Sequence, residues 1–177
     1  MKRSFIAAAV AGIALVSLTV AAGAQSATIL KPVQFGVSAG VSVPSGDLSD
    51  VFDLGYTAGA SIMFNPAMMP LGVRVDGAYN QWSLKGGGDN AHVTSVTGNL
   101  VYRIPSMSVT PYLIGGAGWY NLGGGGESES HLGWNAGGGL SMALSGFDTF
   151  IEARYNRVTG DDVGNSSFIP IVFGVMF

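Results

Sequence analysis

Hydrophobic and polar residues alternate with a period of two along most of the chain. In Val33–Val43, aliphatic or aromatic residues and alanine occupy the odd positions, and glycine, serine or glutamine the even ones. Successive side chains of a β-strand point to opposite faces, so the segment predicts a strand with one apolar face and one small, polar face. The pattern returns in six further segments: Asp53–Phe64, Leu71–Asn80, Ser95–Ile104, Leu132–Leu144, Ile151–Asn156 and Ile169–Phe177.

One further segment, Val109–Leu122, is apolar or glycine on both faces, so the sequence does not decide which of its faces points into the barrel. Counting it gives eight strands of roughly 10–14 residues, enough for tilted membrane-spanning strands. Short turns alternate with longer loops, as in bacterial outer-membrane barrels. The turns are Asn65–Pro70, Pro105–Ser108 and Ser145–Gly146; the loops are Pro44–Asp53, Ser83–Asn90, Gly123–Ser130 and Gly160–Asn165.

A soluble sandwich or lipocalin-like barrel would also have alternating strands, but with more charge on its polar face. Here that face is mostly Gly, Ser, Thr and Asn, and charged residues are only 11% of the chain. Aromatic residues mark both ends of the apolar face: Phe35, Phe64, Tyr102 and Phe177 toward the turns, Tyr56, Tyr79, Trp134 and Tyr155 toward the loops. Two aromatic bands around an aliphatic one are typical of membrane barrels. We therefore predict an all-β, eight-stranded antiparallel transmembrane β-barrel.

The first residues resemble a cleavable signal peptide. Lys2 and Arg3 precede an apolar run, and Ala22–Ala24 is a small-residue cleavage site. We expect a signal peptide over residues 1–24 and the barrel domain over 25–177; the alternative is an uncleaved anchor. Cleavage would leave 8 − 2 = 6 Lys and Arg against 11 Asp and Glu, a formal charge of −5. An acidic chain without a basic face argues against nucleic-acid binding, and the absence of cysteine excludes a thiol nucleophile or a Cys-ligated metal.

Three stretches resemble the small outer-membrane β-barrel family that includes the opacity proteins and the barrel domains of OmpA and OmpX. They are the glycine-rich segment Thr110–Tyr120, the segment Phe150–Tyr155, and the alternating terminus that ends in Phe177. The resemblance implies that Phe177 is a C-terminal signal for the barrel-assembly machinery. It also implies localisation in the outer membrane of a Gram-negative-type bacterium after export across the inner membrane.

Five charged residues fall on the predicted inward face: Arg74, Asp76, Arg103, Glu152 and Arg154. A charge inside a narrow barrel must be paired or hydrated, and an eight-stranded barrel is just wide enough for side chains to fill it. We expect three arginines to face two carboxylates, either as a structural plug of salt bridges or as the lining of a gated pore.

Other candidate sites are weak. The only histidines, His92 and His131, lie near predicted loop ends, and a Ser–His–acid triad is not evident. The glycine runs Gly86–Gly88 and Gly123–Gly126 lack the context of a phosphate-binding loop. Eight acids lie in or beside the longer loops, as a solvated rim or as ligands for divalent cations shared with lipid phosphates: Asp47, Asp50, Asp53, Asp89, Glu127, Glu129, Asp161 and Asp162.

Three functions fit this pattern. The first is a structural or surface-interaction protein that displays four short extracellular loops on a plugged barrel. The second is a narrow channel or a carrier for small, including hydrophobic, solutes, and the third is a lipid-modifying hydrolase. We favour the first, a monomeric non-enzyme without cofactor or metal, whose partners are outer-membrane lipid and, during biogenesis, the barrel-assembly machinery.

Overall fold

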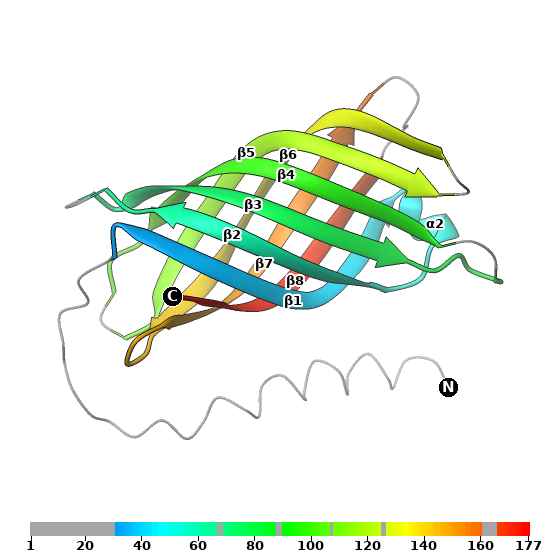
Figure 1. Ribbon diagram of the computed structural model, residues 1–177. Coiled ribbons are helices and arrows are strands. Elements are labelled where there is room, and N and C mark those ends of the chain that lie inside the picture. Colours follow the sequence, from blue (N-terminus) through cyan, green and yellow to red (C-terminus); the bar gives the residue numbers. More distant parts are fainter. Residues whose placement is uncertain (1–30, 67–68, 88–89, 107, 125–126, 161–165) are drawn as a thin grey trace, which may run out of the picture.

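The predicted eight-stranded barrel is confirmed (Figure 1). The computed structural model describes residues 31–66, 69–87, 90–106, 108–124, 127–160 and 166–177, with the backbone alone for 124 and 127. Each strand pairs antiparallel with its sequence neighbours, and β1 pairs with β8 to close the barrel. The strands are β1 (Val33–Gly46), β2 (Gly55–Phe64), β3 (Leu71–Trp82), β4 (Ala91–Arg103), β5 (Thr110–Gly124), β6 (Glu127–Ala143), β7 (Asp148–Thr159) and β8 (Ser166–Met176).

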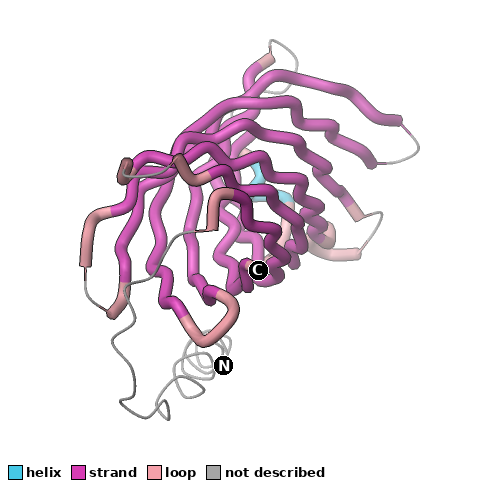
Figure 2. The backbone as a smooth tube through the Cα atoms, turned by 60° about the vertical axis from the view of Figure 1, so that its left-hand side comes forward, coloured by secondary structure: helices cyan, strands magenta, loops and turns pink. Residues whose placement is uncertain are grey.

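Period-two alternation sorts the side chains between the lumen and the outer surface. In β1, Phe35 is 59% exposed on the outside, whereas Gln34 and Ser42 are 3% and 0% exposed inside. Figure 2 shows the strands following one another around the wall. The fold therefore turns a binary sequence pattern into an apolar outer surface and a mostly polar interior.

The two ends of the barrel differ. We call the end that carries the β2–β3, β4–β5 and β6–β7 connections the turn end, and the opposite end the loop end. At the turn end, Gly146 adopts a φ of 104°, which a residue with a side chain rarely does, and Leu144 N–H donates to the Phe147 carbonyl at 2.8 Å. At the loop end, the β1–β2 connection contains the short helix α2 (Leu48–Val51).

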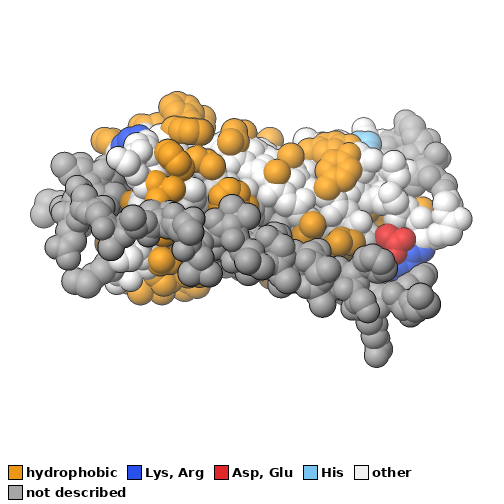
Figure 3. Space-filling view, turned by 90° about the horizontal axis from the view of Figure 1, so that it is seen from below, with side chains coloured by type: hydrophobic (Ala, Val, Ile, Leu, Met, Phe, Trp, Pro, Cys, Tyr) orange, Lys and Arg blue, Asp and Glu red, His pale blue; other side chains and the backbone are white. Residues whose placement is uncertain are grey.

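The outer surface is apolar over most of its height. Figure 3 shows hydrophobic side chains over one face, with charged side chains gathered at its two ends. Aromatic rings meet in both bands: Phe147 and Phe177 at the turn end lie 6.5 Å apart, and Trp134 and Tyr155 toward the loop end lie 5.7 Å apart. No helix among the described residues is long and apolar enough to span a membrane.

Strand β5 settles the face that the sequence left open. Leu113 and Trp119 point outward, 58% and 67% exposed, whereas Tyr112 and Tyr120 point inward, 5% and 0% exposed. Glycine occupies several of the positions between these residues, so apolar and polar residues do not visibly alternate in this part of the sequence.

The loop predicted over Gly123–Ser130 is wrong. Strand β5 extends to Gly124 and β6 begins at Glu127, and the two strands are paired up to these residues. Strand β6, with 17 residues, is longer than the predicted 10–14. The hairpin continues because its own backbone groups pair across the two strands, which glycine and serine permit. The predicted signal peptide over residues 1–24 lies outside the described residues, as do Asp89, Asp161 and Asp162.

Candidate functional site in the barrel lumen

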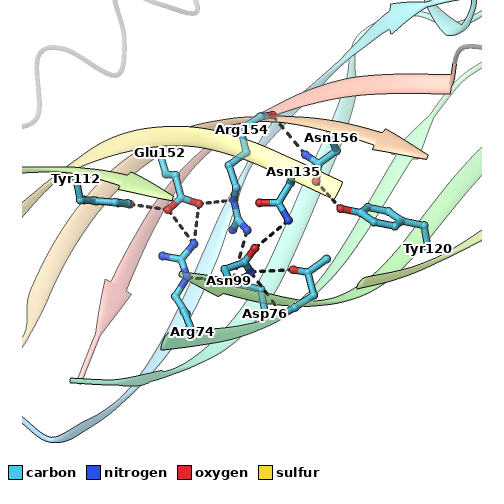
Figure 4. Close-up of polar contacts among 10 residues, drawn as sticks. Arg74, Asp76, Asn99, Tyr112, Tyr120, Asn135, Glu152, Arg154 and Asn156 are labelled. Atoms are coloured by element: carbon cyan, nitrogen blue, oxygen red, sulfur yellow. Dashed lines mark hydrogen bonds and ion pairs between the residues drawn. The ribbon is translucent and has the colours of Figure 1, made fainter. Parts of the chain in front are cut away.

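A closed ring of ion pairs crosses the lumen at mid-height (Figure 4). Arg74 and Asp76 come from β3, and Glu152 and Arg154 come from β7, which lies on the opposite wall of the barrel. Each arginine contacts both carboxylates. The nitrogen–oxygen distances are 2.8 Å for Arg74–Glu152, 3.0 Å for Arg74–Asp76, 2.7 Å for Arg154–Glu152 and 3.4 Å for Arg154–Asp76.

Neutral side chains complete the hydrogen bonding of both carboxylates. Asn99 Nδ2 donates to Asp76 at 2.6 Å, Asn135 Nδ2 donates to Asn99 Oδ1 at 2.9 Å, and the Tyr112 hydroxyl donates to Glu152 at 2.7 Å. Buried charges cost several kcal/mol each unless they are paired and hydrogen-bonded. With Glu152 only 2% exposed, its contacts to two arginines and a phenol offset that cost.

A glycine on β6 makes room for one of these bonds. Tyr112, Gly139 and Glu152 occupy adjacent inward positions on β5, β6 and β7. A Cβ on Gly139 would lie 2.5 Å from the Tyr112 ring and hydroxyl. The absence of a side chain at Gly139 therefore lets Tyr112 lie across β6 and reach Glu152.

Arg103 stands apart from the ring, which differs from the predicted group of five. It points inward near the turn end, four residues beyond Asn99, the residue paired with Arg74. Four residues of strand cover about 13 Å, too far for the same carboxylates. Its buried Nη1 has no hydrogen-bond partner among the described residues. We predicted three arginines facing two carboxylates. In the structure, two arginines, Arg74 and Arg154, pair with the two carboxylates.

Apolar layers close the lumen on both sides of the ion-pair ring. At the loop end, Phe168 packs edge-on against Trp82, with ring centroids 5.1 Å apart, and against Tyr120 at 6.4 Å. Val93 and Val158 complete this layer. The layer toward the turn end consists of Met63, Val101, Tyr112, Ile114, Phe150 and Met176. Among the described side chains, the lumen is therefore occluded twice.

A small cavity, lined by both polar and apolar residues of β1–β4, β7 and β8, remains beside the ring. Its volume is about 40 Å³, and its lining includes Ser38, Thr57, Asn80 and Arg154. The Oδ1 atom of Asn80, a residue only 1% exposed, has no hydrogen-bond partner in the described part of the chain. This volume is enough for about three water molecules.

Beside this cavity, the ladder between β7 and β8 is interrupted. Ala153 pairs with Ile171 and Asn156 pairs with Phe168, but the two residue pairs between them are missing. In that register Arg154 faces Pro170, which has no N–H to donate. The Asn156 side chain donates to the Arg154 carbonyl instead, at a long 3.4 Å.

The two histidines lie away from the lumen network. The His92 ring stacks on Tyr79 with centroids 5.7 Å apart, and His131 lies 3.4 Å from Glu129. Neither histidine is hydrogen-bonded to a serine among the described residues. Within the same residues, no group of three or more His, Asp or Glu side chains could hold a metal ion.

Sequence reasoning missed the apolar layers of the lumen. Phe150 and Phe168 fall on the inward positions of β7 and β8, in phase with Glu152 and Val172. Counting positions two apart would have placed both rings inside. The expectation of a polar interior directed attention only to the charged residues.

Comparisons with solved structures agree on the fold. Neisserial surface protein A (NspA) is 20% identical over 82% of this chain and 96% of its own, with a TM-score of 0.70. Ail, the attachment invasion locus protein of Yersinia pestis, is 20% identical over 81% and 98%, with a TM-score of 0.53. The outer membrane enzyme PagL is 20% identical over 80% and 98%, with a TM-score of 0.53. At these identities the likeness shows the fold alone.

No curated protein matches the chain. A family model, the outer membrane protein beta-barrel domain, matches residues 10–177. That match covers every strand of the closed barrel described above. The chain therefore belongs to the outer membrane protein beta-barrel domain family.

Proposed function

We propose that the protein is a closed outer-membrane barrel that acts through its loop end as a surface-interaction protein. The observation that carries the proposal is the double occlusion of the lumen around a fully paired ring of charges. In this proposal the ring is structural: it ties β3 to β7 and does not line a path for solutes. Arg103 is not part of the ring.

The loop end offers an ordered surface. Asp53 N–H donates to the Ser83 carbonyl at 3.0 Å, and Lys85 N–H donates to the Val51 carbonyl at 2.9 Å, so the β1–β2 and β3–β4 connections are joined. Val51 and Leu54 on this platform are 45% and 58% exposed. Exposed apolar residues among acids suit contact with another molecule.

The β5–β6 hairpin adds a second feature. Pairing of β6 with β7 begins at Leu132 and Thr159, whereas pairing of β6 with β5 extends to Glu127. Among the described residues, the segment Glu127–His131 therefore has a strand partner on one side only. Such an edge favours contact with an extended segment of a partner.

Conductance tests the closed lumen. The refolded protein is placed in a planar bilayer beside an Arg103→Ala variant, and folding is checked by the heat-modifiable band on a gel. No steady conductance of either protein supports the proposal. Stable openings of the wild type, with a selectivity that Arg103→Ala alters, would replace it with the channel hypothesis.

Orientation tests the surface role. The chain has no cysteine, so Ser128→Cys in the hairpin and Ser145→Cys at the turn end each introduce one thiol. We expect a membrane-impermeant maleimide to label the Ser128→Cys variant on intact cells and the Ser145→Cys variant only after permeabilisation. The reverse result would place the loop end inside and end the proposal.

A further inference from the structure

Arg157 is the only Lys, Arg, Asp or Glu on the outward face of the strands among the described side chains. The other charged strand residues take inward positions, as Arg74 and Glu152 do. Arg157 is exposed, and no hydrogen bond or ion pair engages its guanidinium among the described residues. A charge on the lipid-facing surface is strongly destabilising at the bilayer midplane and costs little near the interface. Its depth therefore decides what it contacts.

The depth of Arg157 in the membrane follows from its position along β7. It comes ten residues after Phe147, which belongs to the turn-end aromatic band. At about 3.4 Å per residue and a tilt of about 40°, ten residues climb roughly 26 Å, close to the ~25 Å height of the apolar band of such barrels. Arg157 therefore lies at the level of the lipid headgroups on the loop side.

Two aromatic side chains lie directly beside it. Trp134 on β6 is paired with Arg157, and Tyr155 precedes Arg157 by two residues on the same face. The Trp134 and Tyr155 rings are 5.7 Å apart. Trp and Tyr place their rings at the headgroup level of a membrane. The guanidinium of Arg157 therefore lies beside these rings, at the interface between the membrane and water.

We propose that Arg157, with Trp134 and Tyr155 beside it, binds the phosphate group of an outer-leaflet lipid on the outer wall of β6 and β7. A guanidinium presents a planar fork of donors that matches phosphate oxygens. The two rings pack against the apolar part of the same lipid.

Arg157 distinguishes this wall from the rest of the rim. Glu129 is also exposed on β6, but it lies five residues beyond Trp134, about 17 Å further along the strand. Asp47, Asp50 and Asp53 are exposed in the β1–β2 connection, where they repel an anionic headgroup. The second aromatic group at the loop end consists of Tyr56, Tyr79 and His92, and both phenols donate to Gln81. It includes no Lys or Arg, so it offers no fixed positive charge to a phosphate.

Lipid retention tests the site. The wild type, Arg157→Gln, Arg157→Lys and Lys85→Gln are folded into phosphatidylcholine nanodiscs containing either bisphosphorylated lipid A or its dephosphorylated form. Native mass spectrometry counts retained lipid A, and the gel shift confirms folding. Lys85→Gln removes the same charge from a loop side chain that bonds to the Ser49 carbonyl, and serves as the matched control.

We expect Arg157→Gln to lower retention of phosphorylated lipid A by about fivefold, the effect of one cation near an anionic surface, with Arg157→Lys between it and the wild type. Lys85→Gln should match the wild type, and dephosphorylated lipid A should be retained equally by all four. Millimolar inorganic phosphate should not compete, because the rings require the lipid.

Equal retention by the wild type and Arg157→Gln would overturn the site. If inorganic phosphate competed as strongly as phosphorylated lipid A binds, the site would bind free phosphate, and the assignment of a lipid as its ligand would be wrong. The inference rests on the proposed orientation of the loop end, which the maleimide labelling tests separately.

Discussion

Arg74 and Glu152 stand on opposite walls of the barrel and meet at its centre. One guanidinium nitrogen of Arg74 donates to both oxygens of Glu152, at 2.8 and 2.9 Å. The two residues lie 78 positions apart in the chain, on β3 and β7. The contact therefore exists only when the sheet has closed, and it ties the two halves of the wall together.

Glu152→Gln should destabilise the barrel by about 3 kcal/mol, because it leaves Arg74 and Arg154 with one buried carboxylate between them. The double variant Arg74→Met with Glu152→Leu should cost clearly less, since it removes a pair and leaves Arg154 with Asp76. Urea unfolding in lipid vesicles, followed by the gel shift, measures both. A double variant as unstable as the single one would show that the charges are not coupled.

Gly139→Ala should destabilise the protein by about 1–3 kcal/mol, the usual cost of overpacking. The added methyl group would lie 2.5 Å from the Tyr112 ring and 2.5 Å from the Ile151 carbonyl oxygen, so it would displace the ring from Glu152 and also strain the β6–β7 ladder. Gly98→Ala is the control, because a Cβ there meets nothing within 4 Å. The same urea titration should leave the Gly98→Ala midpoint near that of the wild type. If both variants lost the same stability, the effect would be general to glycines in these strands and would not depend on Tyr112.

Phe168→Ala should cost about 3–5 kcal/mol and open the loop-end layer, because the Phe168 ring fills the space between Trp82 and Tyr120. Phe173→Ala on the same strand is the control, since Phe173 is 53% exposed on the outer surface. Planar-bilayer recordings should show flickering openings for Phe168→Ala alone. Silent recordings of a folded Phe168→Ala variant would show that the turn-end layer and the ion-pair ring suffice to close the lumen.

Pro170→Val should stabilise the barrel by about 1 kcal/mol, because valine supplies the N–H that Arg154 lacks across the β7–β8 ladder. Backbone amides of β7 and β8 near Arg154 should then exchange more slowly with deuterium. Asn156→Ala should cost less in the Pro170→Val background than in the wild type, since its substitute hydrogen bond is no longer needed. Faster exchange near Arg154 would contradict this account of the gap.

Period-two alternation alone determined which face of most strands meets lipid. Val37 and Phe173 were assigned outward and Arg74 and Glu152 inward without knowledge of any contact, and the structure has them so. The reason is local: adjacent Cβ atoms of a strand point to opposite sides whatever the strand pairs with. The number of strands and the membrane character follow from the same pattern repeated along the chain.

Only the closed barrel decided which inward residues meet. Arg154 reaches Asp76 and Arg103 does not, because the stagger of the strands sets the height of each residue in the lumen. Likewise, Tyr112 reaches Glu152 only because Gly139 lies between them. Alternation specifies the face of the strand on which a residue lies but not its height along the barrel axis. Contacts across the lumen join strands distant in sequence, and their register becomes fixed only when β1 pairs with β8.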